Sequence, residues 1–152
     1  MIHGVRIVCV FNPSPRIALE HQPMLEETLY AEPRNHTRHR SRCGHNRRVQ
    51  QGSVVLHGEM DALENAGRQP ASVYRECTIY TTLSPCPMCT GAILLYGIPR
   101  VVVGENVTFQ GDEALLRSRG VRVDVLQDAE CIQLMTDFIA QRPELWNEDI
   151  GE

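Results

Sequence analysis

Helix-like and strand-like segments alternate from about residue 54 onward, and this alternation is the feature that most constrains the fold. Apolar residues at helical intervals predict helices at 57–68, 87–97, 112–120 and 128–142. Runs rich in β-branched residues predict strands at 77–83, 100–106 and 121–126. Asp128 is the expected N-cap of the last helix and Pro143 its expected terminator. Because helices separate these strands, we expect an α/β fold with parallel pairing in this part of the sheet.

The first 42 residues differ in composition from the rest. Residues 5–11 are strand-like, and residues 17–32 are helix-like with a break near Pro23. The run PRNHTRHRSRCGHNRR (33–48) is rich in Arg and His and contains no acidic residue. We interpret this run as a solvated, partly disordered loop. The alternative is an RNA-contacting patch, which is less favoured because no aromatic residue is interleaved with the basic ones.

Size and charge favour an ordinary globular domain. A chain of 152 residues with 42% hydrophobic residues fits one compact domain, and a net charge of -4 gives no reason to expect nucleic acid or a membrane as partner. No apolar run approaches the ~18 residues of a membrane span, and the N-terminus lacks a signal-peptide pattern. We therefore expect an intracellular protein, in which Cys9, Cys77 and Cys131 are small core residues rather than disulfide partners.

The stretch SPCPMCTGA places Cys86 and Cys89 at the start of a predicted helix. At positions i and i+3 the two sulfurs share one face, and the helix N-terminus favours thiolates. This geometry suits a redox pair and a metal site equally well. A metal site needs at least one more strong ligand, whereas a redox pair does not.

His57 and Glu59 open another predicted helix, and His57 is the obvious third ligand. Two Cys and one His leave one coordination position open, which is the catalytic zinc arrangement because zinc lowers the pKa of a water there. Glu59 then lies where a proton carrier is needed. His-x-Glu followed about 28 residues later by Pro-Cys-x-x-Cys matches the signature of zinc nucleobase deaminases.

These motifs resemble those of the cytidine and deoxycytidylate deaminase superfamily, and more closely those of the fungal-type cytosine deaminases. The resemblance is carried by GHNRRVQQGSVVLHGEMDALENAGR (44–68), YTTLSPCPMCTGAILLYGIPRVVVGENVTF (80–109) and FIAQRPELWNEDIGE (138–152). PCPMC alone does not choose among cytosine, guanine and tRNA adenosine deaminases. His-Gly-Glu and the Trp-Asn-Glu-Asp-Ile-Gly-Glu ending favour free cytosine as the substrate.

The resemblance implies a three-layer α/β/α cytidine-deaminase-like fold with a mixed central sheet. It also implies that His57, Cys86 and Cys89 bind one catalytic Zn²⁺ per chain and that Glu59 moves protons. The resemblance also implies that the protein is a homodimer.

Further residues are expected to contact the pyrimidine on the same grounds. They supply hydrogen bonds to the ring edge and stacking surfaces to its faces, as a flat polar ring requires. The resemblance implies that Asn46 hydrogen-bonds the ring and that Asp149 binds the exocyclic amino group. It implies that the backbone N–H groups of Gly58 and Cys86 donate to the ring carbonyl and that the backbone carbonyl of Ser84 accepts from the departing amine. The pocket walls are expected to be Phe109 and Trp146.

The start of the chain departs from the family pattern. Fungal-type cytosine deaminases have a Val-Pro-Ile-Gly-Gly-like strand and a hairpin partner before Gly-His-Asn, whereas only 11 residues separate Glu32 from Gly44 here. We therefore expect the first strands to be missing or altered, with residues 5–11 able to replace one of them. Residues 1–43 are expected to form a divergent, poorly ordered segment or a mis-spliced piece of a gene model, and residues 44–152 the deaminase domain.

The predicted function is zinc-dependent hydrolysis of cytosine to uracil and ammonia in pyrimidine salvage. We expect a cytoplasmic enzyme, with a nuclear location also open, and no nucleic-acid or membrane partner. The alternatives are a related deaminase acting on guanine, a nucleoside or tRNA adenosine, and a catalytically impaired zinc-binding paralogue.

Overall fold

The computed structural model describes residues 6–11 and 42–152, and for residues 6–11 it describes the backbone only. In chain order the elements are β1 (Arg6–Phe11), β2 (Arg42–His45), α1 (Arg48–Gln51), α2 (Gly58–Ala66), α3 (Ala71–Tyr74), β3 (Thr78–Leu83), α4 (Pro87–Tyr96), β4 (Arg100–Glu105), α5 (Glu113–Ser118), β5 (Arg122–Val125), α6 (Ala129–Gln141) and α7 (Pro143–Ile150). The helices and strands predicted between residues 57 and 142 are all confirmed, with boundaries shifted by one or two residues.

The central sheet is mixed, as expected. Its five strands have the order β2-β1-β3-β4-β5. β3 pairs with β4 and β4 with β5 in parallel, so the parallel pairing inferred from the crossover helices is confirmed. β1 pairs antiparallel with both β2 and β3.

The first strands are altered, as expected. Arg42–His45 forms the edge strand β2, and β1 (Arg6–Phe11) lies between it and β3, so the strand-like segment near the N-terminus does replace a strand. Such a short strand is accommodated because α2 packs directly on Gly44, where an added Cβ would lie 2.3 Å from the backbone nitrogen of Ala62.

Part of the basic run is structured rather than a solvated loop. Within 33–48, residues 42–45 belong to β2, and Arg48 begins α1 with its side chain only 15% exposed. That interpretation is therefore wrong for these residues. The helix predicted at 17–32 and residues 33–41 of the run lie outside the described residues, and the division of the chain at residue 43 stays a prediction.

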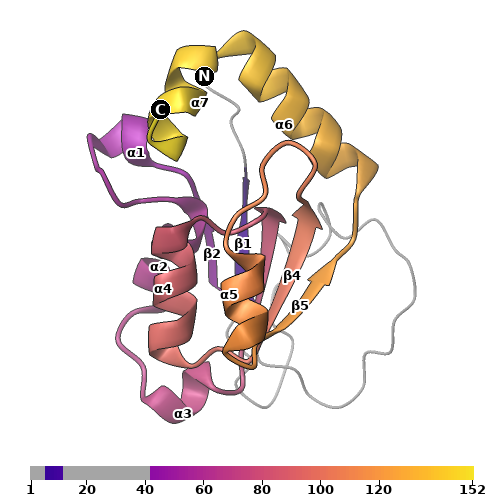
Figure 1. Cartoon of the computed structure of the whole chain (residues 1–152). Coiled ribbons are helices and arrows are strands. Elements are labelled where there is room, and N and C mark those ends of the chain that lie inside the picture. Colours follow the sequence, from indigo (N-terminus) through magenta and orange to yellow (C-terminus); the bar gives the residue numbers. More distant parts are fainter. Residues whose placement is uncertain (1–5, 12–41) are drawn as a thin grey trace, which may run out of the picture.

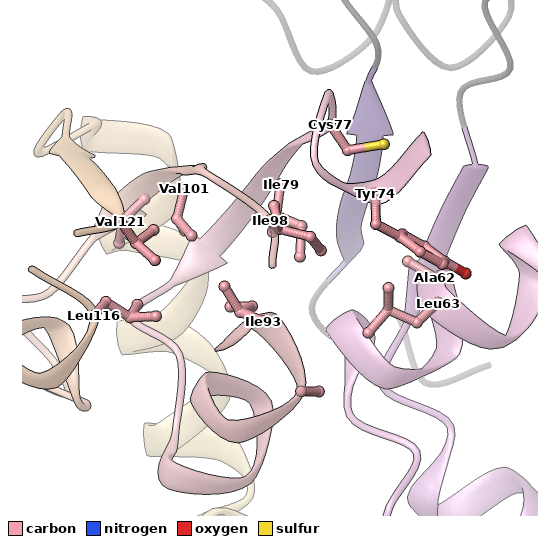
Figure 2. Close-up of a cluster of buried hydrophobic side chains, with 12 residues drawn as sticks. Ala62, Leu63, Tyr74, Cys77, Ile79, Ile93, Ile98, Val101, Leu116 and Val121 are labelled. Atoms are coloured by element: carbon pink, nitrogen blue, oxygen red, sulfur yellow. The ribbon is translucent and has the colours of Figure 1, made fainter. Parts of the chain in front are cut away.

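Helices cover both faces of the sheet. On one face, the core combines side chains of α2, α4 and α5 with alternate residues of β3 and β4, among them Ile79, Ile93, Val101 and Leu116 (Figure 2). On the other face, α6 packs against β3 and β4, and Cys131 of α6 lies against Gly104. The expected three-layer α/β/α architecture is thus confirmed (Figure 1).

The end of the chain forms a helix that the sequence patterns did not predict. Asp128 caps α6 as predicted, its side chain accepting from the Cys131 backbone N–H at 2.9 Å. Pro143 does end α6, but it also occupies the first turn of α7. Figure 1 shows α7 beside α1, so the C-terminal residues meet the segment that follows Gly-His-Asn.

Cys77 and Cys131 are buried, as predicted, and the five cysteines whose side chains are described are free thiols. The side chain of Cys9 lies outside the described part. Within the described ranges, no helix combines the length and the apolar character that a membrane span requires.

Candidate active site

Two helix N-termini meet at the carboxyl end of β3. His57 is the N-cap of α2 and Cys86 the N-cap of α4, and Pro87 follows at the first helical position of α4. Both caps have extended backbone angles, as N-cap residues do, so their side chains project from the helix ends. The capping positions and the ligand motifs therefore coincide.

The His57, Cys86 and Cys89 donor atoms lie within 4.8 Å of one another, and Cys86 Sγ is 3.5 Å from His57 Nδ1. Tetrahedral zinc with bonds of about 2.0–2.3 Å separates neighbouring ligand atoms by about 3.5–3.8 Å. Cys89 is fully buried, whereas His57 and Cys86 are half-buried and line a cavity. This donor set fits one Zn²⁺, which would be held by His57, Cys86 and Cys89 beside the cavity.

The two sulfurs make the site electron-rich. The hydrogen bond from Cys89 lowers the pKa of the Cys86 thiol to about 4, and the same contact raises the pKa of Cys89. Burial lowers the pKa of His57, but its hydrogen bond to Cys86 and the charge there outweigh burial and raise it. Two thiols in contact thus share one negative charge, and a divalent cation is what allows both to be thiolates.

Glu59 lies directly beside this cluster. Its side chain is 8% exposed, one oxygen accepts from Thr81 Oγ1 at 3.1 Å, and the other accepts from Cys89 Sγ at 3.4 Å. Burial raises the pKa of Glu59, which favours a carboxyl group that can hold a proton. The carboxyl group also reaches the cavity, so it can exchange a proton with a molecule bound there.

The residues expected to contact substrate gather around one cavity of about 440 Å³. Its wall includes the expected set Asn46, Gly58, Ser84, Cys86, Phe109, Trp146 and Asp149, together with His57 and Glu59. Phe109 and Trp146 meet edge to face, with ring centroids 5.8 Å apart and planes at 86°. Met135, Phe138, Leu145 and Ile150 add apolar wall that the motifs did not indicate.

Asn46 and Asp149, 103 positions apart, are in direct contact. Asn46 Nδ2 donates to Asp149 Oδ2 at 2.7 Å, and Asn46 Oδ1 accepts from the Arg48 backbone N–H at 3.1 Å. The other Asp149 oxygen is ion-paired with the guanidinium of Arg48. Sequence reasoning missed Arg48, since it assigned the basic run to solvent. The two-residue spacing from Asn46 in Gly-His-Asn-Arg-Arg was the available signal.

A match to a known protein family covers this centre. The cytidine and deoxycytidylate deaminase zinc-binding region matches residues 35–105, a stretch that begins before Gly44 and includes both ligand-bearing helix N-termini. With the α/β/α fold and the fitting donor set, this defines the class: a zinc-dependent deaminase with one Zn²⁺ per chain.

Relatives place the chain within that class. The cytosine deaminase of Candida albicans is 66% identical over 109 residues, which are 72% of this chain and 73% of the relative. A tRNA-specific adenosine deaminase of Streptococcus pyogenes is 33% identical over 64% of this chain and 68% of its own length. The chain belongs to the fungal-type cytosine deaminase family.

Solved structures with the same fold are more distant in sequence. A variant of NE0047 in complex with 8-azaguanine superposes with a TM-score of 0.52 at 21% identity, over 64% of each chain. This likeness supports the fold and extends over slightly less than two thirds of that protein.

Proposed function

We propose that the chain catalyses the hydrolytic deamination of cytosine to uracil and ammonia. The observation that carries this proposal is one cavity whose wall includes His57 and Cys86 of the metal-ligand cluster, Glu59, and the polar pair Asn46 and Asp149. The 66% identity to the Candida albicans cytosine deaminase supports cytosine as the substrate.

His57, Cys86 and Cys89 hold the zinc in this proposal. When bound there, zinc acts as a Lewis acid that makes water a competent nucleophile at neutral pH. The protein contributes the two helix N-termini that place these ligands and the burial that fixes them.

Glu59 carries the protons. It takes a proton from the attacking water and delivers it to ring N3, while the water oxygen forms its bond to C4. Glu59 then moves the second proton of the former water from the hydroxyl on C4 to the amino group. The C4–N bond breaks as the C4 carbonyl forms, and ammonia leaves uracil behind. The raised pKa of Glu59 suits this role, because the group must hold a proton between the two transfers.

The remaining residues bind and orient the ring. The Phe109 and Trp146 rings provide apolar surface for its faces, and Asn46 and Asp149 provide hydrogen bonds for its edge. Gly58 is the first residue of α2, where a backbone N–H has no acceptor within the helix and can donate to the ring carbonyl, as can the N–H of Cys86. The Ser84 carbonyl receives the departing amine.

We place this reaction in pyrimidine salvage, carried out by a homodimer in the cytoplasm and nucleus. The last turn of α4 supports self-association, because Leu95 is 78% exposed and Tyr96 beside it is 40% exposed. Light scattering at micromolar concentration tests the assembly, and a monomer would contradict it.

The decisive experiment measures ammonia release by the zinc-loaded protein from cytosine, cytidine, guanine and adenine. We expect release from cytosine and a drop of about 10²- to 10⁴-fold in the Glu59→Gln variant at unchanged zinc content. Release from guanine or a nucleoside instead would identify a related deaminase. Salt-sensitive RNA binding with adenosine deamination would identify a tRNA enzyme. One zinc per chain with no release from any substrate would identify a non-catalytic paralogue.

A further inference from the structure

Both carboxylate oxygens of Asp149 are bound by side chains of the short segment 46–48. Asn46 holds Oδ2, and the guanidinium of Arg48 holds Oδ1. We propose that Arg48 is a positioning residue that fixes the Asp149 carboxylate for the exocyclic amino group of cytosine. This inference rests on the proposed function and deepens it, because it names the group that sets recognition of the amine.

The position of Asp149 on its helix shows why an external cation is needed. Asp149 lies in the last turn of α7, where unpaired backbone carbonyls create negative potential, and Glu148 precedes it. The last turn of α7 contains no basic residue of its own. Arg48 supplies the missing charge from α1, and its Nη1 also donates to the Glu148 carbonyl at 3.3 Å.

The anchoring of α7 shows why orientation depends on this contact. None of the residues of α7 is fully buried, so apolar packing holds this helix less firmly than the core helices. Besides the contacts of Asp149, α7 is held by an edge-to-face contact between the rings of Trp146 and Phe109. The ion pair therefore contributes strongly to where the Asp149 carboxylate points.

Arg48 is itself held in place. Its side chain is 15% exposed and its Nε is buried without a hydrogen-bond partner in the described structure. Burial makes a charge pair stronger and its loss costlier than at the surface. An Arg48 that faced solvent instead would leave Asp149 beside the helix carbonyls with only Asn46 to orient it. The amine of cytosine would then lose an aligned acceptor.

The test measures binding in a Glu59→Gln background, in which cytosine is not consumed. Calorimetry compares cytosine with pyrimidin-2-one, the same ring without the amino group. We expect Arg48→Met to weaken cytosine binding about 10- to 100-fold, the range for a hydrogen bond to a charged group, and pyrimidin-2-one binding far less. Arg142→Met is the matched control, because Arg142 is exposed at the start of α7 and outside the cavity wall.

A double-mutant cycle with Asp149→Asn shows whether Arg48 acts through Asp149. If it does, Arg48→Met adds little further loss once Asp149 is changed. Arg48→Lys keeps the charge on a different donor geometry and should restore part of the affinity. It also replaces Arg48→Met in the cycle if unfolding or zinc content shows that the Met variant does not fold.

Two outcomes would overturn the inference: equal losses for cytosine and pyrimidin-2-one, which indicate a general structural role, or fully additive losses in the cycle. Failure of the proposed function is distinguished by the parent chain. If the unmutated protein releases no ammonia from cytosine and the Glu59→Gln variant does not bind it, both proposals fail. If it does release ammonia, only the positioning role is at stake.

Discussion

The hydroxyl of Ser84 donates a hydrogen bond of 2.9 Å to the buried carboxylate of Glu113. The same carboxylate accepts from Asn106 Nδ2 at 2.9 Å and from Arg117 Nη1 at 3.0 Å. Ser84 Oγ in turn accepts from the Gly111 backbone N–H at 3.0 Å. Hydrogen bonds from the start of α5 and the residues just before it therefore fix the position of Ser84, which follows β3 and lines the cavity.

Glu113→Gln should destabilise the protein at pH 7 and less so in acid. Burial raises the pKa of Glu113, but hydrogen bonds from Asn106, Ser84 and Arg117 outweigh burial and lower it below its usual value of 4.5. A depressed pKa means that the stabilisation is complete above the unfolded-state value and is lost as the pH falls through the folded-state value. We expect a loss of about 1–3 kcal/mol at pH 7, which shrinks below about pH 4.5.

Denaturant unfolding of both proteins at neutral and acidic pH measures this effect. Glu64→Gln, at an exposed position of α2, is the matched control and should change stability by under about 0.5 kcal/mol. A difference between wild type and Glu113→Gln that stays constant down to pH 3 would contradict the assignment.

Thr81 should assist proton transfer by Glu59. Its hydroxyl lies 3.1 Å from Glu59 Oε1 and 2.9 Å from the Leu83 carbonyl, yet it carries a single proton. When the hydroxyl donates to Leu83, its oxygen can accept from a protonated Glu59; otherwise it donates to the carboxylate. One residue therefore serves both protonation states.

Thr81→Val keeps the shape and removes the hydroxyl. We expect kcat for cytosine to fall about 10- to 100-fold, the usual effect of a lost supporting hydrogen bond, while zinc content stays the same. Thr81→Ser should recover most of the rate. If the Val and Ser variants turn over equally fast, Thr81 has no part in the proton path.

Trp146 should report substrate binding directly, because it is the single tryptophan of the chain and lines the cavity. In the Glu59→Gln variant, titration with cytosine should give a saturable change in tryptophan emission as the ring enters beside the indole. Phe109→Leu removes the ring partner of Trp146 and should weaken the binding measured this way. Calorimetric binding with unchanged emission would show that cytosine lies elsewhere.

The zinc cluster could be predicted because its information is local. The spacing from His57 to Glu59 and from Cys86 to Cys89 coincides with helix starts, and capping geometry then determines where the side chains point. The parallel half of the sheet was predictable for a similar reason, since crossover helices determine the direction of the next strand.

The rest depended on contacts between distant parts of the chain. No periodicity within residues 6–11 indicates that this strand lies between β2 and β3, because strand order is set by pairing over long sequence separations. The basic run predicted a solvated Arg48, whereas in the structure Arg48 forms an ion pair with Asp149 of α7. α7 was missed because Pro143 was interpreted as the terminator of the preceding helix, whereas proline is also favoured at the first position of a new one.

Gly111 and Gly91 should respond oppositely to substitution by alanine. A Cβ at Gly111 would lie 2.0 Å from the Pro85 carbonyl oxygen, a backbone atom that cannot move without shifting Ser84. A Cβ at Gly91, exposed within α4, would meet nothing within 4 Å.

Gly91→Ala should therefore stabilise the protein by roughly 0.5–1 kcal/mol through helix propensity. Gly111→Ala should destabilise it by about 1–3 kcal/mol through overpacking and lower kcat/KM for cytosine. Urea unfolding measures the change in stability, and ammonia release measures the change in activity. A Gly111→Ala variant as stable and active as Gly91→Ala would show that the segment just before α5 does not position Ser84.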